Sequence, residues 1–193
     1  FIAAPLLGQL SDRYGRKPIL IISKIGTIAS YIILGSTASY AWLLISRSLD
    51  GFTGGNIAVA RAYLSDITDE QNRSKAMAII GVAFGTGFII GPAIGGICYS
   101  ISNNFSIAGY IGAALSLLSL IITQVYLEEP TEKSHRPPTK LLKNINQITK
   151  PAMTILCISL ASMIIFSGFE TSFSIYTEHK FGFNESNNSL LFF

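Results

Sequence analysis

Charged residues are scarce in this chain: Asp, Glu, Lys and Arg make up 13% of its 193 residues, whereas 49% are hydrophobic. The mean hydropathy is +0.47, which is typical of a membrane protein and not of a soluble globular domain. The two cysteines, Cys98 and Cys157, lie in or beside apolar runs, so neither a disulfide framework nor a zinc site is indicated. We expect the two histidines, His135 and His179, to lie in loops. No Ser-His-Asp, metal-ligand or phosphate-cradling pattern occurs, so we predict no enzyme, no metal and no cofactor.

Hydrophobic runs recur along the chain, each close to the roughly 20 apolar residues that a spanning helix needs. They lack strand-like alternation, which favours helices over a β-barrel. We therefore expect an all-α membrane protein. The predicted spans are the tail of one span, five complete spans and the start of a last one: 1–10, 19–38, 41–64, 76–97, 105–127, 151–175 and from 188 onward.

Cations in the connections between these spans indicate which side of the membrane each connection faces. In chain order, the connections carry three, zero, three, zero, five and one Lys or Arg residues. Cytoplasmic loops carry an excess of Lys and Arg, so we place connections 11–18, 61–75 and 128–150 in the cytoplasm of a multi-pass membrane protein. Tyr40 and Trp42 then lie at the opposite interface, where aromatic residues gather.

The connection 128–150 is the one candidate for a linker between domains. Its first half, EEPTEKSHRPP, is charged and rich in proline, which disfavours a helix. Its second half predicts a short amphipathic helix along the cytoplasmic membrane surface, with four residues on the apolar face: Leu141, Leu142, Ile145 and Ile148. Prolines and glutamates interrupt its cations, which argues against nucleic acid as a partner.

Residues Gly8 to Pro18, GQLSDRYGRKP, form a charged turn between two apolar runs. So short a turn makes the flanking helices antiparallel neighbours. We expect Gly8 to remove a side chain where another helix approaches closely, and Gly15 to adopt a positive φ. Pro18 suits the first turn of the next helix, and Asp12 can accept hydrogen bonds from a cation or a helix N-terminus.

Two further motifs follow downstream. The first is R-S-L-D-G at residues 47–51, followed by Gly54-Gly55; the second is a glycine-proline motif in span 76–97. With GQLSDRYGRKP, they resemble three motifs of major facilitator superfamily transporters, found after the second helix and in the fourth and fifth helices. The segments YLSDITD (63–69) and EHKFGF (178–183) are similar to the tetracycline-resistance-like branch of the drug:proton antiporters.

The resemblance implies roughly helices two to seven of a twelve-helix bundle, so we expect an internal fragment. Residues 1–127 would form an N-terminal six-helix domain lacking its first helix, 128–150 the linker, and 151–193 the start of the C-terminal domain. The implied function is secondary active transport, with export of small amphipathic or cationic compounds in exchange for protons by alternating access. The expected partners are a small-molecule substrate, protons and the lipid bilayer, and the whole protein is expected to be monomeric.

Two alternatives stay open. One is a symporter or uniporter of the same fold for sugars or anions; the glycine-proline motif and the lack of a P-E-S-P-R segment after the sixth helix argue against it. The other is a scaffold or receptor that does not transport, although the gate charges and Arg47 are intact. Tetracycline exporters carry an acidic residue in the third helix where this chain has Ser30-Tyr31, which argues against tetracycline as the substrate.

By resemblance, the charged turn locks the cytoplasmic side in the outward-facing state; a solvated loop that only sets topology is the alternative. We assign this gate to seven residues: Gly8, Asp12, Arg13, Gly15, Arg16, Asp66 and Arg73. Asp66 and Arg73, at the next cytoplasmic turn, are candidate partners of Arg16 and Asp12. Their alternative role is solvation at the membrane interface.

Arg47 lies about seven residues into its span, and a charge at the centre of a spanning helix costs about 2.5–3.5 kcal/mol. Asp50 stands three residues later, within reach of an ion pair. The resemblance implies that Arg47, with Asp50, faces the central cavity and takes part in proton coupling. The alternative is a snorkelling arginine with a local carboxylate partner.

The glycine-proline motif consists of Gly87, Gly91, Pro92, Gly95 and Gly96. Its glycines at every fourth position share one helix face and permit close packing, and the proline bends the helix. By resemblance, this bend lies at the domain interface and prevents leak, while ordinary helix packing is the alternative.

Two more charged residues fall within predicted spans. Glu170, near the non-cytoplasmic boundary, is a possible substrate or proton carboxylate, or it reaches the headgroups. Lys24 is five residues from a cytoplasmic span end and is expected to snorkel to the interface.

Overall fold

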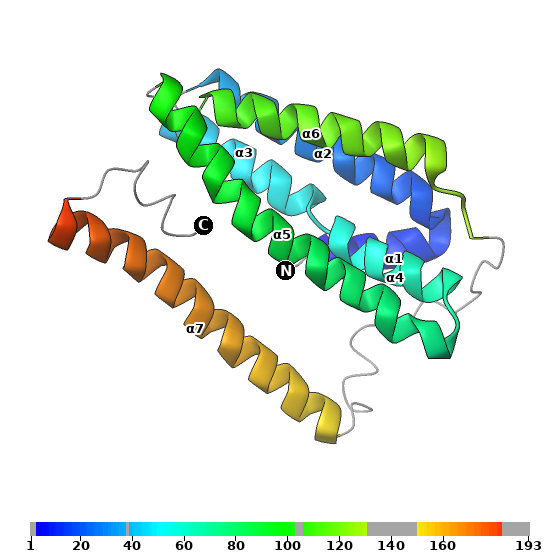
Figure 1. Ribbon diagram of the computed structural model, residues 1–193. Helices are drawn as coiled ribbons and strands as arrows, with labels where there is room; N and C mark the ends of the chain where they lie inside the picture. Colours follow the sequence, from blue (N-terminus) through cyan, green and yellow to red (C-terminus); the bar gives the residue numbers. More distant parts are fainter. Residues whose placement is uncertain (1–2, 38, 103–105, 131–149, 183–193) are drawn as a thin grey trace.

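The computed structural model describes residues 3–37, 39–102, 106–130 and 150–182, apart from a few side chains in the helices, among them that of Glu170. All regular secondary structure in these residues is α-helical (Figure 1). The helices are α1 (Ala3–Tyr14), α2 (Arg16–Ser36), α3 (Tyr40–Thr53), α4 (Asn56–Ile67), α5 (Glu70–Ser102), α6 (Ser106–Tyr126) and α7 (Lys150–Phe181).

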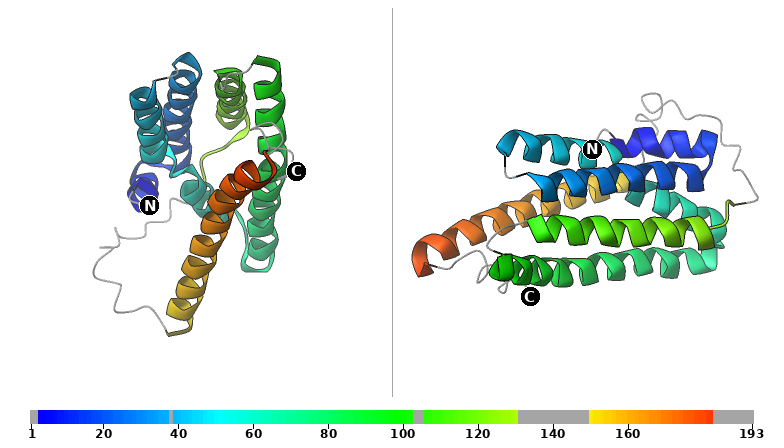
Figure 2. Two further views of the ribbon diagram at one scale, coloured as in Figure 1. Left: turned by 90° about the vertical axis from the view of Figure 1, so that its left-hand side faces the viewer. Right: turned by 90° about the horizontal axis from the view of Figure 1, so that it is seen from above.

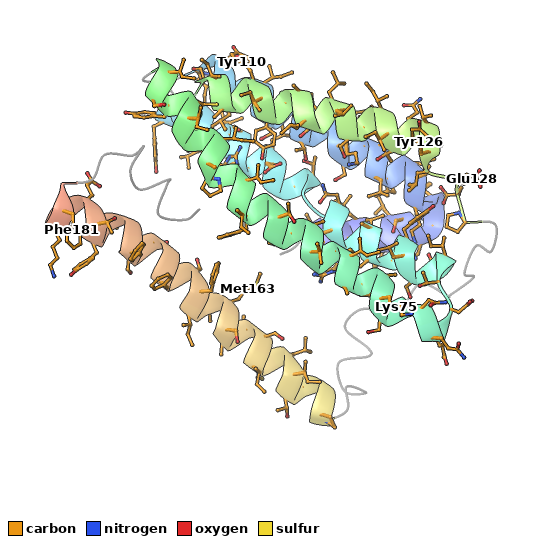
Figure 3. All side chains as sticks on the ribbon, in the orientation of Figure 1. Lys75, Tyr110, Tyr126, Glu128, Met163 and Phe181 are labelled. Carbon is orange, nitrogen blue, oxygen red and sulfur yellow. The ribbon has the colours of Figure 1, made fainter. Side chains whose placement is uncertain are left out.

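The helices run back and forth between two ends of a bundle. The α1–α2 turn, the α4–α5 turn and the C-terminal end of α6 lie together at the right of Figure 1, while the α2–α3 and α5–α6 connections lie at the opposite end. Lys75 and Glu128 mark the first of these ends in Figure 3. The described parts of the three connections expected in the cytoplasm are therefore on the same side of the bundle.

Helix α2 packs between α3 and α6, and the row α3, α2, α6, α5 is clear in both views of Figure 2. Small residues allow the α2–α6 contact, because a Cβ at Gly109 would lie 2.7 Å from the backbone nitrogen of Gly35. On the other side, the buried Ser30 and Ser46 donate to each other's backbone carbonyls, both at 2.8 Å. These contacts fix α2 as the centre of the row.

Among the described residues, four helices are long and apolar enough to cross a membrane: Arg16–Ser36, Glu70–Ile101, Ser106–Tyr126 and Met153–Phe181. Their apolar side chains point outward around much of the bundle (Figure 3). In the most apolar 18-residue stretch of α5, and in that of α7, no residue is buried within the described structure. Helix α7 touches α5 through the rings of Phe88 and Phe166, whose centroids are 5.5 Å apart. These faces are thus available to lipid or to further helices.

The prediction of one continuous helix over 41–64 is wrong, because the chain breaks into α3 and α4 at Gly54-Gly55. Both glycines have ψ near zero, at 8° and 6°. A Cβ at Gly55 would lie 2.6 Å from Leu7 Cδ1 and 3.2 Å from the carbonyl oxygen of Ala3. Because Gly55 has no side chain, α1 can approach the backbone at this break closely. Glycine is also a poor helix former, so two of them in a row favour the break.

The charged turn is shorter than predicted. Helix α1 continues to Tyr14 and α2 begins at Arg16, so Gly15 alone separates them. Gly15 has the predicted positive φ, at 107°, and Pro18 lies in the first turn of α2, as expected. Gly8 lies inside α1, and a Cβ there would meet no described atom within 4 Å, so its close approach to another helix stays a prediction.

The other spans agree with the prediction except at their ends, where α5 and α7 extend several residues further. Two predictions fall outside the described residues: the amphipathic helix of 128–150 and the span from 188 onward. The division of the chain into domains stays a prediction.

Candidate functional site

Arg16, the first residue of α2, is the centre of a charged cluster at the end of the bundle that the Lys and Arg counts predict to be cytoplasmic. Its Nη1 lies 2.6 Å from Asp12 Oδ1 of α1, and its Nε lies 2.8 Å from Asp66 Oδ2 of α4. Nη1 also donates to Ser11 Oγ at 2.5 Å. The Arg16 side chain is 10% exposed, and such a buried guanidinium is stable where carboxylates and hydroxyls satisfy its donors. The cluster joins three helices through one side chain.

Glu129, just after α6, holds the same residue from the other side. One carboxylate oxygen accepts the backbone N–H of Arg16 at 2.6 Å, and the other accepts that of Lys17 at 2.9 Å. The first N–H groups of a helix have no partner within it and carry a partial positive charge, so a carboxylate there stabilises the helix. A Cβ at Gly15 would lie 2.6 Å from Glu129 Oε1, so the glycine also makes room for this cap.

The other gate residues are placed differently. Arg73 does not pair with Asp12: its Nη2 donates to the Ser65 carbonyl at 3.4 Å, and its buried Nε has no acceptor among the described residues. Arg13 lies over the Tyr14 ring, with its guanidinium carbon 5.4 Å from the centroid. The structure thus joins Asp12, Arg16 and Asp66 and leaves Arg13 and Arg73 outside the cluster.

Arg47, in α3, has two partners. Its Nη1 lies 3.8 Å from Asp50 Oδ2, one turn later, which is a loose ion pair. Its guanidinium carbon lies 5.5 Å from the centroid of the Tyr31 ring in α2, which is cation–π geometry. The Arg47 side chain is 43% exposed within the described structure, so it remains accessible despite both contacts.

The glycine face of α5 has no neighbour in the described part of the chain. A Cβ at Gly87, Gly91 or Gly95 would meet no atom within 4 Å. Gly96 is buried, and Pro92 lies inside a helix that continues through it. The close packing predicted for this face is therefore not formed by α1 to α4, by α6 or by α7. The side chain of Glu170 lies outside the described part of the structure.

The family model of the Major Facilitator Superfamily matches residues 1–193. The chain belongs to the Major Facilitator Superfamily. It is 32% identical over 189 residues to the class B tetracycline resistance protein of Escherichia coli, and the aligned residues make up 95% of this chain and 47% of that protein. It is 32% identical over 193 residues to multidrug resistance protein 1 of Bacillus subtilis (strain 168), covering 98% of this chain and 49% of that protein.

A solved structure gives the same result for the fold. The human organic anion transporter MFSD10 (TETRAN) superposes with a TM-score of 0.77 and 25% identity, over 100% of this chain and 50% of that one. The chain thus spans about half the length of these relatives. As a superfamily member, it is an all-α, multi-pass integral membrane protein with part of the superfamily fold. The superfamily transports small molecules.

One cavity of this superfamily member lies within the described half, between α2, α4 and α6, and we call it the α2/α4/α6 cavity. Its volume is about 390 Å³. Most of its lining is apolar, from residues such as Leu20, Ile57 and Leu127, with a minority of polar side chains: Lys24, Asn56, Tyr63 and Thr123. Lys24 Nζ donates a hydrogen bond to Ser119 Oγ, so α6 holds the ammonium beside the cavity.

Sequence reasoning did not predict the cap that Glu129 forms on α2, or the position of Lys24 beside the cavity. Glu128 and Glu129 were visible only as charges at the start of the linker. Their importance depends on the end of α6 lying beside the start of α2, more than 100 positions earlier. For Lys24, the signal was present, since a cation inside a membrane span indicates a functional site by default.

Proposed function

We propose that the whole protein carrying this chain is a proton-coupled antiporter that exports small amphipathic or cationic compounds by alternating access. The observation that carries the proposal is the match of almost all of this chain to tetracycline and multidrug resistance proteins. The charged motifs lie in the residues that match the superfamily, and Arg16 and Arg47 have carboxylate partners in the structure.

In this proposal, the Arg16 cluster belongs to the cytoplasmic gate. Its partners Asp12, Asp66 and Glu129 hold α1, α2, α4 and the end of α6 together as one unit. Asp12 is the most exposed side chain of the two ion pairs, at 41%, and is therefore the group best placed to meet the other half of the transporter. Rocking of the halves would make and break that contact while the Arg16–Asp66 pair stays closed.

Arg47 is the proposed coupling residue. A guanidinium keeps its charge at all physiological pH values, so it can lower the pKa of a nearby carboxylate but does not itself release a proton. In this proposal, Asp50 or a carboxylate of the other half carries the proton, and Arg47 favours its release when substrate binds. The Tyr31 ring supports the guanidinium without offering a second negative charge.

The experiment is transport by the whole protein in sealed vesicles under an imposed pH gradient. Ethidium, an amphipathic cation, serves as substrate, and pyranine inside the vesicles reports proton movement. We expect ethidium accumulation coupled to proton efflux, loss of both in Arg47→Ala, and normal behaviour in Lys75→Gln, an exposed cation outside both sites. Arg47→Ala should still insert into the membrane. Normal pH-driven uptake by this variant would refute the coupling role.

One observation favours a second candidate, transport of organic anions. The superposed structure with a TM-score of 0.77 is an organic anion transporter. The same vesicles distinguish the two functions, because an anion exporter would move an aryl sulfonate and leave ethidium behind.

A further inference from the structure

Lys24 places a positive charge inside a predicted membrane span, with no ion-pair partner among the described residues. It is eight residues into α2, which is about 12 Å along the helix from its cytoplasmic start. Among the described residues, it takes part in no ion pair, and its Nζ is held by the neutral hydroxyl of Ser119. An ammonium has three N–H donors, so this contact leaves donors for a ligand.

The α2/α4/α6 cavity next to this charge has the size and chemistry of a small-molecule site. Its volume of about 390 Å³ lies within the ~300–1,000 Å³ usual for ligand pockets. The apolar lining suits a ring system or short hydrocarbon chain, and the Asn56 side-chain amide adds N–H donors, whereas the Tyr63 and Thr123 hydroxyls already donate to the backbone carbonyls of Glu128 and Ser119. One cation, a few polar groups and an apolar wall match a ligand with one anionic group on an apolar body.

The cavity is distinct from the two sites already described. The side chains of the Arg16 cluster come from α1, α2, α4 and Glu129 at the end of the bundle, and Arg47 lies in α3, which contributes no lining residue. None of the gate or coupling residues lines the cavity. A ligand held by Lys24 would therefore bind without displacing any of their contacts.

We propose that Lys24 and the α2/α4/α6 cavity form a binding site for an amphipathic anion, a carboxylate, sulfonate or phosphate group on an apolar body. The ammonium binds the anionic group, and the apolar wall of α2, α4 and α6 covers the rest of the ligand. This inference does not depend on proton-driven export, because it concerns binding alone.

The test measures equilibrium binding of naphthalene-2-sulfonate to the whole protein, purified in a neutral detergent with no pH gradient. The probe is permanently anionic, and naphthalene-2-sulfonamide gives a neutral analogue with the same ring. We expect saturable binding of the sulfonate, and binding of the sulfonamide at least ten-fold weaker, because a hydrogen bond to a charged group contributes more than a neutral one.

Four variants separate the charge from the fold. Lys24→Gln should weaken sulfonate binding at least ten-fold, and Lys24→Arg should keep it within about three-fold, since the charge is retained. Ala60→Phe fills the cavity and should also weaken binding, with Lys24 in place. Lys75→Gln removes an exposed cation at the same end of the bundle and should leave binding unchanged.

A final arm identifies the source of the anion. If a lipid headgroup occupies the site, phosphatidylglycerol in phosphatidylcholine vesicles should compete with the sulfonate; if a translocated substrate does, the sulfonate should be taken up and the lipid should not compete. Both results support the site. Absence of saturable sulfonate binding would overturn it, as would full affinity in Lys24→Gln, an equal loss in Lys75→Gln, or equally tight binding of the sulfonamide.

Discussion

Glu129 and Arg16 stand 113 positions apart in the sequence, yet the Glu129 carboxylate accepts the backbone N–H of Arg16 at 2.6 Å. The same arginine holds Asp12 and Asp66 with its side chain. Arg16 is therefore fixed at its backbone by the segment after α6 and at its guanidinium by α1 and α4. The start of α2 cannot move without disturbing one of these contacts.

Replacing Glu129 by alanine should destabilise the whole protein by about 1 kcal/mol, the usual effect of losing a helix N-terminal cap. Two backbone N–H groups, of Arg16 and Lys17, would lose their acceptor. Glu128→Ala is the matched control, because the hydrogen bond that Glu128 accepts from the Tyr63 hydroxyl is through its backbone carbonyl, which the substitution keeps. Unfolding of both variants in mixed micelles checks the prediction, which fails if the two substitutions cost the same.

Alanine at Gly15 and at Gly8 should change stability in opposite directions. Gly15 has φ 107°, and a Cβ there would lie 2.6 Å from the Glu129 carboxylate, so Gly15→Ala adds backbone strain and disrupts the cap. Gly8 lies inside α1 with no described atom within 4 Å of an added Cβ, so Gly8→Ala should stabilise the helix by about 0.5–1 kcal/mol. Apparent melting temperatures of the two variants give the signs, and a lower melting temperature for Gly8→Ala would contradict the placement of α1.

Double-mutant cycles should rank the two carboxylates that Arg16 binds. Arg16 and Asp66 are 10% and 15% exposed, whereas Asp12 is 41% exposed. Water and salt weaken exposed ion pairs, so we expect a coupling energy of about 1.5–3 kcal/mol for Arg16–Asp66 and below about 1 kcal/mol for Arg16–Asp12. The cycles combine Arg16→Ala with Asp66→Ala or Asp12→Ala. Equal couplings, or an Asp66 coupling that vanishes in high salt, would show that the first pair is not buried.

Much of the fold could be predicted from the sequence because membrane spans depend on local composition. Runs of apolar residues located α2, α5, α6 and α7, and the Lys and Arg counts placed three connections at one end. The Arg16–Asp66 pair was one of two alternatives for Asp66, the other being solvation at the membrane interface, and the structure contains the pair. The cap by Glu129 could not be predicted, because it depends on the end of α6 lying beside the start of α2. The cavity at Lys24 could not be predicted either, because it depends on which faces of α2, α4 and α6 lie side by side. Gly54 and Gly55 are weak helix formers, which the sequence shows, but the reason for a break at this point is the close approach of α1, which it does not show.

Tyr31 should influence Arg47 through its ring and not through its hydroxyl. The ring centroid lies 5.5 Å from the guanidinium carbon, and the only ion pair of Arg47 among the described residues is the loose one with Asp50. Tyr31→Phe keeps the aromatic face and should retain pH-driven transport, whereas Tyr31→Leu removes a contact of about 0.5–1 kcal/mol and should shift the pH dependence of transport. Transport rates across a pH series distinguish this from simple loss of packing, which would lower the rate at every pH equally.

The open glycine face of α5 should tolerate a large side chain in folding but not in coupling. A Cβ at Gly91 meets no described atom within 4 Å, whereas a Cβ at Gly109 would lie 2.7 Å from the Gly35 backbone nitrogen. Gly109→Leu should therefore prevent folding, and Gly91→Leu should give a folded protein. If this face packs against the other half during rocking, Gly91→Leu should uncouple proton flux from substrate flux, while Gly85→Leu, also open but about 120° around α5 from Gly91, should not. A proton-flux assay beside substrate uptake makes the comparison, and unchanged antiport in Gly91→Leu would show that this face borders lipid instead of the other half.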